Sequence, residues 1–201
     1  MTQPSRHPRL ANASLYVLTD GAANEADFET RIAQFIAAGV DVVQLRDKSL
    51  DDRTLLRRAT TLAHQSRGTT TLSIINDRTD IAMASAADGV HLGQDDLPID
   101  QVRRITGGQM LIGLSTHSPE QALAAEQSGA DYIGVGPTFP SQTKTFSAFT
   151  GMELLTAVAS TIHIPAFAIG GITLERIPDI LRTGIHRVAV ANAICGVDNP
   201  V

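Results

Sequence analysis

The chain has 201 residues, of which 43% are hydrophobic and 18% are charged, and its formal net charge is −5. This length supports one full core and leaves too little chain for two domains, while the negative charge argues against a general attraction to nucleic acid or anionic membranes. The single cysteine excludes an intramolecular disulfide framework, and no apolar run approaches the roughly 20 residues that span a bilayer. We expect a cytoplasmic protein whose anionic ligands need a local pocket; whether it is a monomer or a homo-oligomer stays open.

Residues 1–13 are expected to form a polar leader, because the first nine contain charges and proline but no hydrophobic signal core. From there, apolar β-branched runs alternate with segments of helical periodicity. The predicted strands are 15–18, 40–45, 72–75, 90–92, 111–114, 132–135, 166–169 and 187–190. The predicted helices are 28–38, 55–64, 81–86, 99–104, 119–128, 152–160 and 174–181.

The strand runs are continuous rather than alternating, which is typical of buried parallel strands. Eight such units predict a (β/α)8 TIM barrel that occupies residues 14–201 as one domain. Glycines at 39, 68, 129 and 184 follow helical segments and can take the left-handed conformation that ends a helix. Few residues follow the eighth strand, so we expect the closing helix to be short or missing. A six-stranded doubly wound sheet is the alternative, but it leaves two of the runs unused.

Polar residues follow the predicted strands at the end where a barrel builds its site. At the end of the second strand, three polar residues occupy alternate positions: Gln44, Arg46 and Lys48. Their side chains would point to one side of the strand, and that of Leu45 to the other. An ordinary exposed strand end could have the same pattern. Ser115 comes directly after the fifth strand. These residue types can bind an anionic ligand if the neighbouring strand ends carry a compatible site.

Two residue pairs that contain carboxylates, Asn76-Asp77 and Asp95-Asp96, follow the third and fourth strands. Hard divalent cations bind carboxylate and phosphate oxygens together, and Arg and Lys donors compensate the remaining phosphate charge. The pattern therefore predicts a magnesium-pyrophosphate site, with Asp96 favoured over Asp95 as the second ligand. Asp77 could instead be an N-cap, and the second pair a solvated turn before Pro98.

The segment 134–144 offers glycine amides, hydroxyls and Lys144, which together suit phosphate oxygens. Gly170-Gly171 precedes a predicted helix, an arrangement that can bind a monophosphate at the helix N-terminus, although two glycines alone are weak evidence. His117 follows the fifth strand at the site end and could act as an acid or base. His91 lies within a strand and is expected to be a buried, hydrogen-bonded structural residue.

Seven motifs occur in order along the chain: Tyr-Val-Leu-Thr-Asp, Val-Gln-Leu-Arg-Asp-Lys, Ile-Asn-Asp-Arg, Gly-Val-His-Leu-Gly-Gln-Asp-Asp, Gly-Leu-Ser-Thr-His, Asp-Tyr-Ile-Gly-Val-Gly-Pro-Thr-Phe-Pro-Ser-Gln-Thr-Lys and Ala-Ile-Gly-Gly-Ile. With these motifs the chain resembles the thiamine phosphate synthase family of (β/α)8 enzymes, from about residue 15 to about residue 194. The resemblance implies a transferase of thiamine biosynthesis. Its substrates would be 4-amino-2-methyl-5-hydroxymethylpyrimidine diphosphate and 4-methyl-5-(2-phosphoethyl)thiazole, coupled by a dissociative, Mg²⁺-assisted substitution that releases pyrophosphate.

The resemblance also implies residue roles. Asp77 and Asp96 would hold Mg²⁺. The pyrophosphate of the pyrimidine substrate would be bound by Arg46, Lys48, Asn76, Ser115 and Lys144, and Gln44 would contact the same substrate. The thiazole phosphate would be bound by Ser141, Thr143, Gly171 and Asn192. Arg46, Lys48, Ser115 and Lys144 are the expected catalytic residues, because the leaving group needs its charge neutralised and the reaction needs no protein nucleophile.

The chain departs from the family pattern in two places. The turn after the eighth strand usually reads Val-Ser-Ala-Ile and here contains Asn192, whose amide can still donate. The proline-rich stretch that commonly follows the loop lysine is replaced by residues 145–150. Two rival functions stay open: a thiazole tautomerase that moves a proton with a histidine such as His117 and has no need of Asp77 and Asp96, and a catalytically silent binding barrel.

Overall fold

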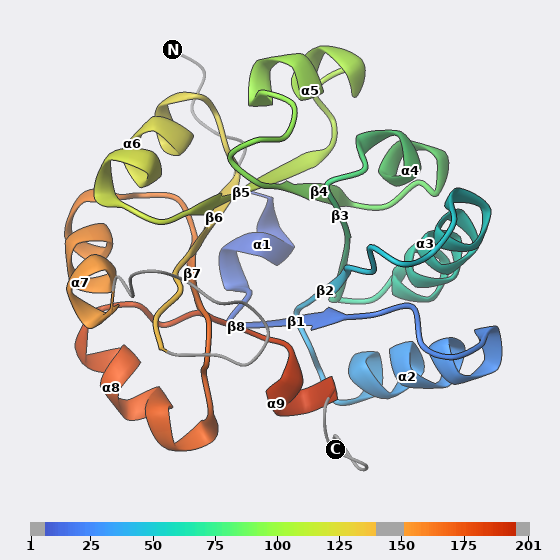
Figure 1. Ribbon diagram of the computed structural model, residues 1–201, viewed down its shortest axis with the longest axis horizontal. Coiled ribbons are helices and arrows are strands. Elements are labelled where there is room, and N and C mark those ends of the chain that lie inside the picture. The colour runs from blue at the N-terminus through green and yellow to red at the C-terminus, as the bar shows by residue number, and fades with distance from the viewer. Residues whose placement is uncertain (1–6, 140–150, 196–201) are drawn as a thin grey trace.

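The computed structural model describes residues 7–139 and 151–195. Its strands form a closed parallel barrel in chain order, with β8 paired to β1 (Figure 1). They are β1 (Leu15–Thr19), β2 (Val42–Leu45), β3 (Leu72–Asn76), β4 (Gly89–Leu92), β5 (Leu111–Thr116), β6 (Tyr132–Val135), β7 (Ala166–Ile169) and β8 (Val188–Val190). The predicted (β/α)8 barrel is confirmed, and closure of all eight strands excludes the six-stranded alternative.

Helices surround the barrel and alternate with its strands (Figure 1). They are α2 (Glu25–Ala37), α3 (Asp52–Ser66), α4 (Thr79–Ala84), α5 (Ile99–Ile105), α6 (Pro119–Gln127), α7 (Gly151–Thr161), the 3₁₀ turn η1 (Leu174–Arg176), α8 (Ile177–Arg182) and α9 (Asn192–Cys195). The four glycines predicted to end helices all have positive φ, between 78° and 91°. Within the described residues, α9 covers four positions, in agreement with the short closing helix that was predicted.

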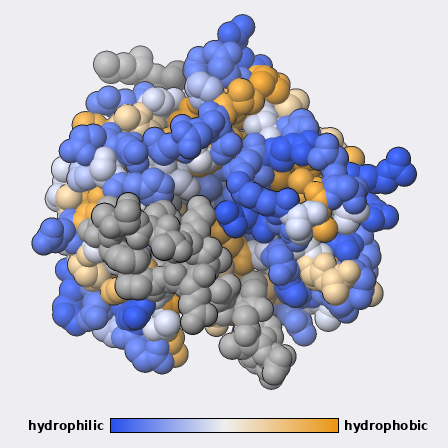
Figure 2. All heavy atoms as spheres, in the orientation of Figure 1, coloured by the Kyte–Doolittle hydropathy of each residue, from blue (hydrophilic) through white to orange (hydrophobic). Residues whose placement is uncertain are grey.

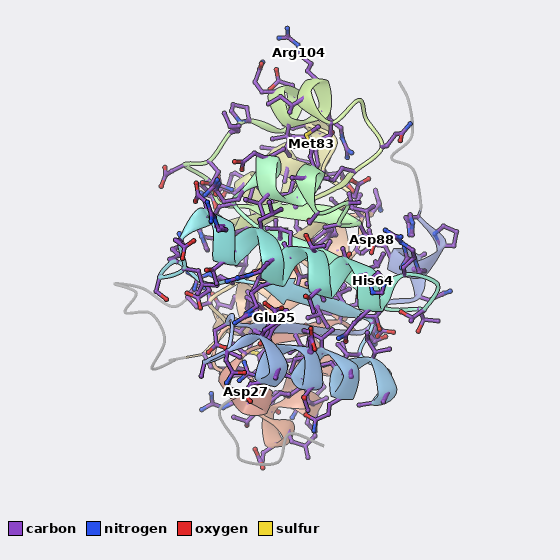
Figure 3. All side chains as sticks on the ribbon, turned by 90° about the vertical axis from the view of Figure 1, so that its right-hand side faces the viewer. Glu25, Asp27, His64, Met83, Asp88 and Arg104 are labelled. Carbon is purple, nitrogen blue, oxygen red and sulfur yellow. The ribbon has the colours of Figure 1, made fainter. Side chains whose placement is uncertain are left out.

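The predicted polar leader contains a helix that the sequence analysis did not predict, α1 (Pro8–Asn12). Its Leu10 side chain is buried, and Arg9 donates to the carbonyl oxygen of Thr71 and pairs with Asp88, both just before strands begin. Asp88 accordingly lies beside α1 in Figure 3. The helix therefore closes the barrel at the N-terminal ends of the strands, opposite the predicted site.

Side chains of the strands divide into two cores because they alternate between the two faces of the sheet. One face packs against the surrounding helices and forms the larger cluster. The other fills the barrel, where Tyr16, Ile74, Tyr132 and Phe167 pack together with Leu10 of α1 below them. Each large buried apolar side chain contributes about 1.5–3 kcal/mol, so the interior is a packed core rather than a pore.

Outside the barrel, α2 and α3 pack side by side (Figure 3). Glu25, which begins α2, accepts hydrogen bonds from Thr61 and from the buried guanidinium of Arg58, both on α3. Hydrophilic residues dominate the face shown in Figure 2. Among the described residues, no helix is long and apolar enough to cross a membrane.

Candidate functional site

The carboxyl ends of neighbouring strands bring most of the predicted site residues to one rim of the barrel. Parallel pairing places Asn76, the last residue of β3, opposite His91 of β4. Ser115 of β5 lies opposite Gly134 of β6 in the same way. Gln44 is buried on β2, one residue before that strand ends. Residues from four successive strands therefore face a shared region at the end of the barrel where such folds bind ligands.

Asp77 and Asp96 are brought together although nineteen positions separate them in sequence. Each carboxyl group shifts the pKa of the other, and Lys48 Nζ lies 2.9 Å from Asp77 Oδ2. Burial by itself would raise the pKa of Asp77, but the hydrogen bonds from Lys48 and Asp96 and the charges of Lys48 and Arg46 lower it below its usual value. The pair is thus a concentrated acidic group flanked by two cations.

The local backbone sets the direction of each carboxylate. Asp77 has φ 59°, in the left-handed region that Asp tolerates better than most residues, and its N–H donates to the carbonyl oxygen of His91 at 2.8 Å. Asp96 Oδ2 accepts from the Gly93 N–H at 2.6 Å. Burial and the neighbouring Asp77 carboxylate raise the pKa of Asp96 against the lowering effect of that N–H. Asp95 is exposed.

This donor set suits a hard divalent cation. Two neighbouring carboxylates can both turn to one ion, and each offers only oxygen ligands. Within residues 7–139 and 151–195, no group of three or more His, Cys, Asp or Glu side chains could hold a metal ion. Water and phosphate oxygens can supply the remaining ligands, which is how proteins usually bind Mg²⁺.

A chain of buried polar side chains crosses the barrel below this rim. Gln44 Nε2 donates to Tyr16 Oη at 2.6 Å, and Tyr16 Oη lies 3.1 Å from Tyr132 Oη. Tyr132 Oη lies 3.2 Å from His91 Nδ1, and His91 Nε2 lies 3.0 Å from Ser115 Oγ. Two predicted substrate contacts, Gln44 and Ser115, are therefore joined through three residues to which the sequence analysis gave no role in binding.

The expectation that His91 is buried and hydrogen-bonded is confirmed, since the residue is 9% exposed. Its place between Tyr132 and Ser115 was not predicted. The strand registers explain this contact, because His91 of β4 is paired with Gly113 of β5, and Gly113 is paired with Tyr132 of β6. The contact becomes readable from the sequence only once the order and stagger of the strands are known.

His117 is exposed at the end of β5, and its Nδ1 lies 2.5 Å from the carbonyl oxygen of Gly136. A carbonyl can only accept, so Nδ1 carries the proton in this hydrogen bond. The backbone N–H of His117 donates to the side chain of Gln121. The residue thus ties the end of β5 to the end of β6.

The region of the predicted thiazole phosphate site is described in part. Gly170 and Gly171 have φ 99° and 62°, and Arg176 donates to the carbonyl oxygen of Gly171 at 2.5 Å. The Arg176 guanidinium also lies 4.5 Å from the centre of the Phe139 ring. Asn192 begins α9. Ser141 and Thr143, which are predicted to bind this phosphate, lie outside the described residues, as does Lys144, which is predicted to bind the pyrophosphate.

Comparisons with known proteins agree with this geometry. The family model described as thiamine monophosphate synthase matches residues 15–194. A thiamine-phosphate synthase of Rhodopirellula baltica is 48% identical over 199 residues, covering 96% of this chain and 53% of the relative. A thiamine-phosphate synthase of a Mycobacterium species is 42% identical and covers 96% of this chain and 90% of the relative. The chain therefore spans about half the length of one of these relatives and nearly all of the other.

Solved structures give the same result. A thiamine phosphate pyrophosphorylase from Pyrococcus furiosus superposes with a TM-score of 0.84 at 33% identity, covering 96% of this chain and 92% of that one. An N-acetylmannosamine-6-phosphate 2-epimerase from Clostridium perfringens superposes with a TM-score of 0.69 at 14% identity. At that identity the second likeness shows only the fold.

Proposed function

Because the chain belongs to the thiamine monophosphate synthase family, we propose that it is a transferase that couples 4-amino-2-methyl-5-hydroxymethylpyrimidine diphosphate with 4-methyl-5-(2-phosphoethyl)thiazole. The products would be thiamine phosphate and pyrophosphate. One observation carries the proposal beyond family membership: the Asp77 and Asp96 pair lies beside Lys48 and Arg46, at the rim above the hydrogen-bonded side chains that run from Gln44 to Ser115. That combination suits a diphosphate attached to a small polar ring.

We assign Mg²⁺ binding to Asp77 and Asp96. When bound, the ion would supply positive charge to the pyrophosphate oxygens. Arg46, Lys48 and Lys144 would neutralise the remaining charge as the leaving group develops it, and Asn76 and Ser115 would donate hydrogen bonds to the same oxygens. No protein nucleophile is required, since an electron-rich aminopyrimidine can expel pyrophosphate and leave a stabilised cation that the thiazole nitrogen captures.

The side chain of Gln44 supports a place for the pyrimidine beside it. Its Nε2 donates a hydrogen bond to Tyr16 Oη, and its Oε1 is buried with no hydrogen-bond partner among the described residues. A buried acceptor without a donor is costly, and an exocyclic amine on a ligand would satisfy it. At the other end of the site, Ser141, Thr143, Gly171 and Asn192 would hold the thiazole phosphate. Binding there would align the two substrates.

The geometry bears on both rival functions. A thiazole tautomerase would move a proton with a histidine such as His117, whose Nδ1 donates to the Gly136 carbonyl and leaves that role to Nε2. It would have no need of Asp77 and Asp96, so their pairing favours coupling. A silent binding barrel would have no use for an acidic pair between two cations. Action in the cytoplasm on small molecules, without nucleic acid or membrane partners, remains a prediction from composition, and the possibility of a homo-oligomer is untested.

The proposed activity is tested by mixing the chain with both substrates and titrating Mg²⁺ while pyrophosphate release is measured. Release should require both substrates and should rise with Mg²⁺ until it saturates. Omission of the thiazole phosphate is the control for simple hydrolysis of the diphosphate. Tautomerisation of a thiazole phosphate without any coupling would assign the chain to the rival function.

A further inference from the structure

The buried polar chain from Gln44 to Ser115 has a direction, which follows from counting its protons. An amide nitrogen can only donate, so Tyr16 Oη accepts from Gln44 Nε2. Burial raises the pKa of Tyr16 and of Tyr132 well above the usual value for a phenol. Both hydroxyls therefore keep their protons at any ordinary pH, and each must place that proton in one hydrogen bond.

Tyr16 can give its proton to Tyr132, whose oxygen is 3.1 Å away. Tyr132 then gives its own proton to His91 Nδ1 at 3.2 Å. With Nδ1 accepting, a neutral His91 carries its proton on Nε2 and donates it to Ser115 Oγ at 3.0 Å. The opposite direction would make Tyr132 donate to Tyr16. With the Gln44 amide oriented as in the structure, its Nε2 faces Tyr16 Oη, so the Tyr16 proton would then have no acceptor, which costs a lost hydrogen bond.

We infer that Tyr132 and His91 form a one-way hydrogen-bond relay that makes Ser115 an obligatory outward donor. Ser115 Oγ accepts from His91, so its own proton is left to point into the site. Tyr132 and His91 are positioning residues in this relay: they act through Ser115 and need not touch its ligand. The inference rests on the proposed function for the identity of that ligand, the pyrophosphate group, whose oxygens only accept.

The packing around Tyr132 is consistent with a defined position for its hydroxyl. A Cβ at Gly113 of β5 would lie 2.1 Å from Tyr132 Cζ and 2.5 Å from its hydroxyl oxygen. The glycine thus leaves the space through which the ring crosses to His91. Phe167 packs edge-on against both tyrosines, at 5.3 Å from Tyr16 and 5.8 Å from Tyr132 between ring centres. These contacts restrict the positions of both tyrosine rings and therefore of their hydroxyl groups.

The direction of the hydrogen-bond relay is tested on the unaltered protein by ¹⁵N NMR of its histidine side chains at neutral pH. The His91 signals are identified by their loss in His91→Asn. We expect the neutral tautomer with the proton on Nε2. A His91 that carries its proton on Nδ1, or that is doubly protonated at this pH, would overturn the relay, because Nδ1 would then donate to Tyr132.

The consequence for binding is tested with inorganic pyrophosphate and Mg²⁺ by calorimetry. Ser115→Ala and Tyr132→Phe should each weaken binding about tenfold, as expected for loss of one hydrogen bond to a charged group. The double variant should be no weaker than Ser115→Ala alone, because both changes remove the same donor. Tyr16→Phe is the matched control: it also deletes a buried phenol hydroxyl but leaves Tyr132 as the donor to His91, so binding should fall less than threefold.

Additive losses in the double variant would show that Tyr132 acts independently of Ser115 and would overturn the relay. Equal losses in Tyr16→Phe and Tyr132→Phe would do the same, since they would indicate a general packing role. Circular dichroism checks that each variant is folded. If the unaltered chain does not bind pyrophosphate, the proposed function fails and so does the ligand assigned to Ser115, while the His91 tautomer still decides the direction of the relay.

Discussion

The pKa values of Asp77 and Asp96 are shifted in opposite directions although each carboxyl group acts on the other. The difference arises because Lys48 and Arg46 lie close to Asp77, whereas burial and the Asp77 charge dominate at Asp96. Such a pair holds negative charge that is only partly compensated by the protein. A cation with oxygen ligands would relieve the repulsion between the two carboxylates and is the simplest reason for placing them together.

We predict that Asp77→Ala and Asp96→Ala each abolish coupling while the fold remains intact, because each removes one of two carboxylates from a site formed by strand ends. The measurement is pyrophosphate release across a Mg²⁺ titration, with circular dichroism as the fold control. Asp95→Ala removes an exposed carboxylate next to Asp96 and should retain most activity. Near-normal turnover of both site variants would refute the assigned metal site.

His117 leads to a second prediction at this scale, because its proton on Nδ1 serves a backbone contact. Replacement by Asn should reduce coupling about tenfold or less, since one neutral hydrogen bond contributes roughly 1 kcal/mol. General acid-base catalysis would contribute about 10²–10⁴ in rate. Coupling and thiazole tautomerisation are both measured on His117→Asn. A loss of a thousandfold in either activity would give His117 a catalytic role.

At the scale of the elements, the loops after β1 and β2 are joined by Asp47. Its Oδ2 accepts from the Gly21 N–H at 3.1 Å, and its Oδ1 accepts from the Ser49 N–H and hydroxyl at 2.9 and 2.6 Å. Burial would raise the pKa of Asp47, but these hydrogen bonds lower it below its usual value. The carboxylate therefore fixes the loop that carries Arg46 and Lys48 on either side of it.

Asp47→Ala should consequently lower the free energy of unfolding by about 1 kcal/mol at neutral pH. A carboxyl group with a depressed pKa stabilises the fold above its unfolded pKa of about 3.9, and this contribution is lost as the pH falls through the folded pKa. The difference between the unaltered chain and the variant should thus shrink below about pH 4. Urea unfolding at pH 7 and at pH 3 measures it. A difference independent of pH would contradict the role of the charge, and Asp95→Ala should change stability little at either pH.

At the scale of the whole molecule, the barrel has a site at one end and a closure at the other. α1 lies across the N-terminal ends of the strands, where Leu10 packs into the interior cluster and Arg187 donates to the carbonyl oxygen of Ala11. Stability and binding are therefore served by opposite ends of the same strands, as is general in this fold. A change at one end should leave the other largely unaffected.

Leu10→Ala should destabilise the protein by roughly 2–4 kcal/mol, because it removes a buried side chain that is 3% exposed and leaves a cavity. Coupling activity measured well below the unfolding temperature should stay within about twofold of normal. The matched control is Leu174→Ala, the same change at a side chain that is 83% exposed, which should alter the melting temperature little. Loss of activity in folded Leu10→Ala would show that the two ends are coupled.

Much of the fold could be predicted from local signals in the sequence. Continuous β-branched runs indicate strands buried on both faces, and glycines at 39, 68, 129 and 184 mark helix ends because only glycine takes positive φ without strain. The candidate site was also accessible, because parallel strands bring their carboxyl ends to one rim. Gln44, Asp77 and Asp96 could be placed together for that reason alone. The roles of Ser141, Thr143 and Lys144 remain predictions.

The tertiary structure alone decided which polar side chains meet inside the barrel. Tyr16 and Tyr132 are 116 positions apart and touch only because β1 and β6 face each other across the interior. Their contact with His91 depends on the stagger of the strands, which apolar runs do not encode, since a shift of one residue moves a side chain to the other face of the sheet. α1 was missed for a related reason. A five-residue helix with one buried leucine has no periodicity, and it is stable only because the open end of the barrel provides a place for that leucine.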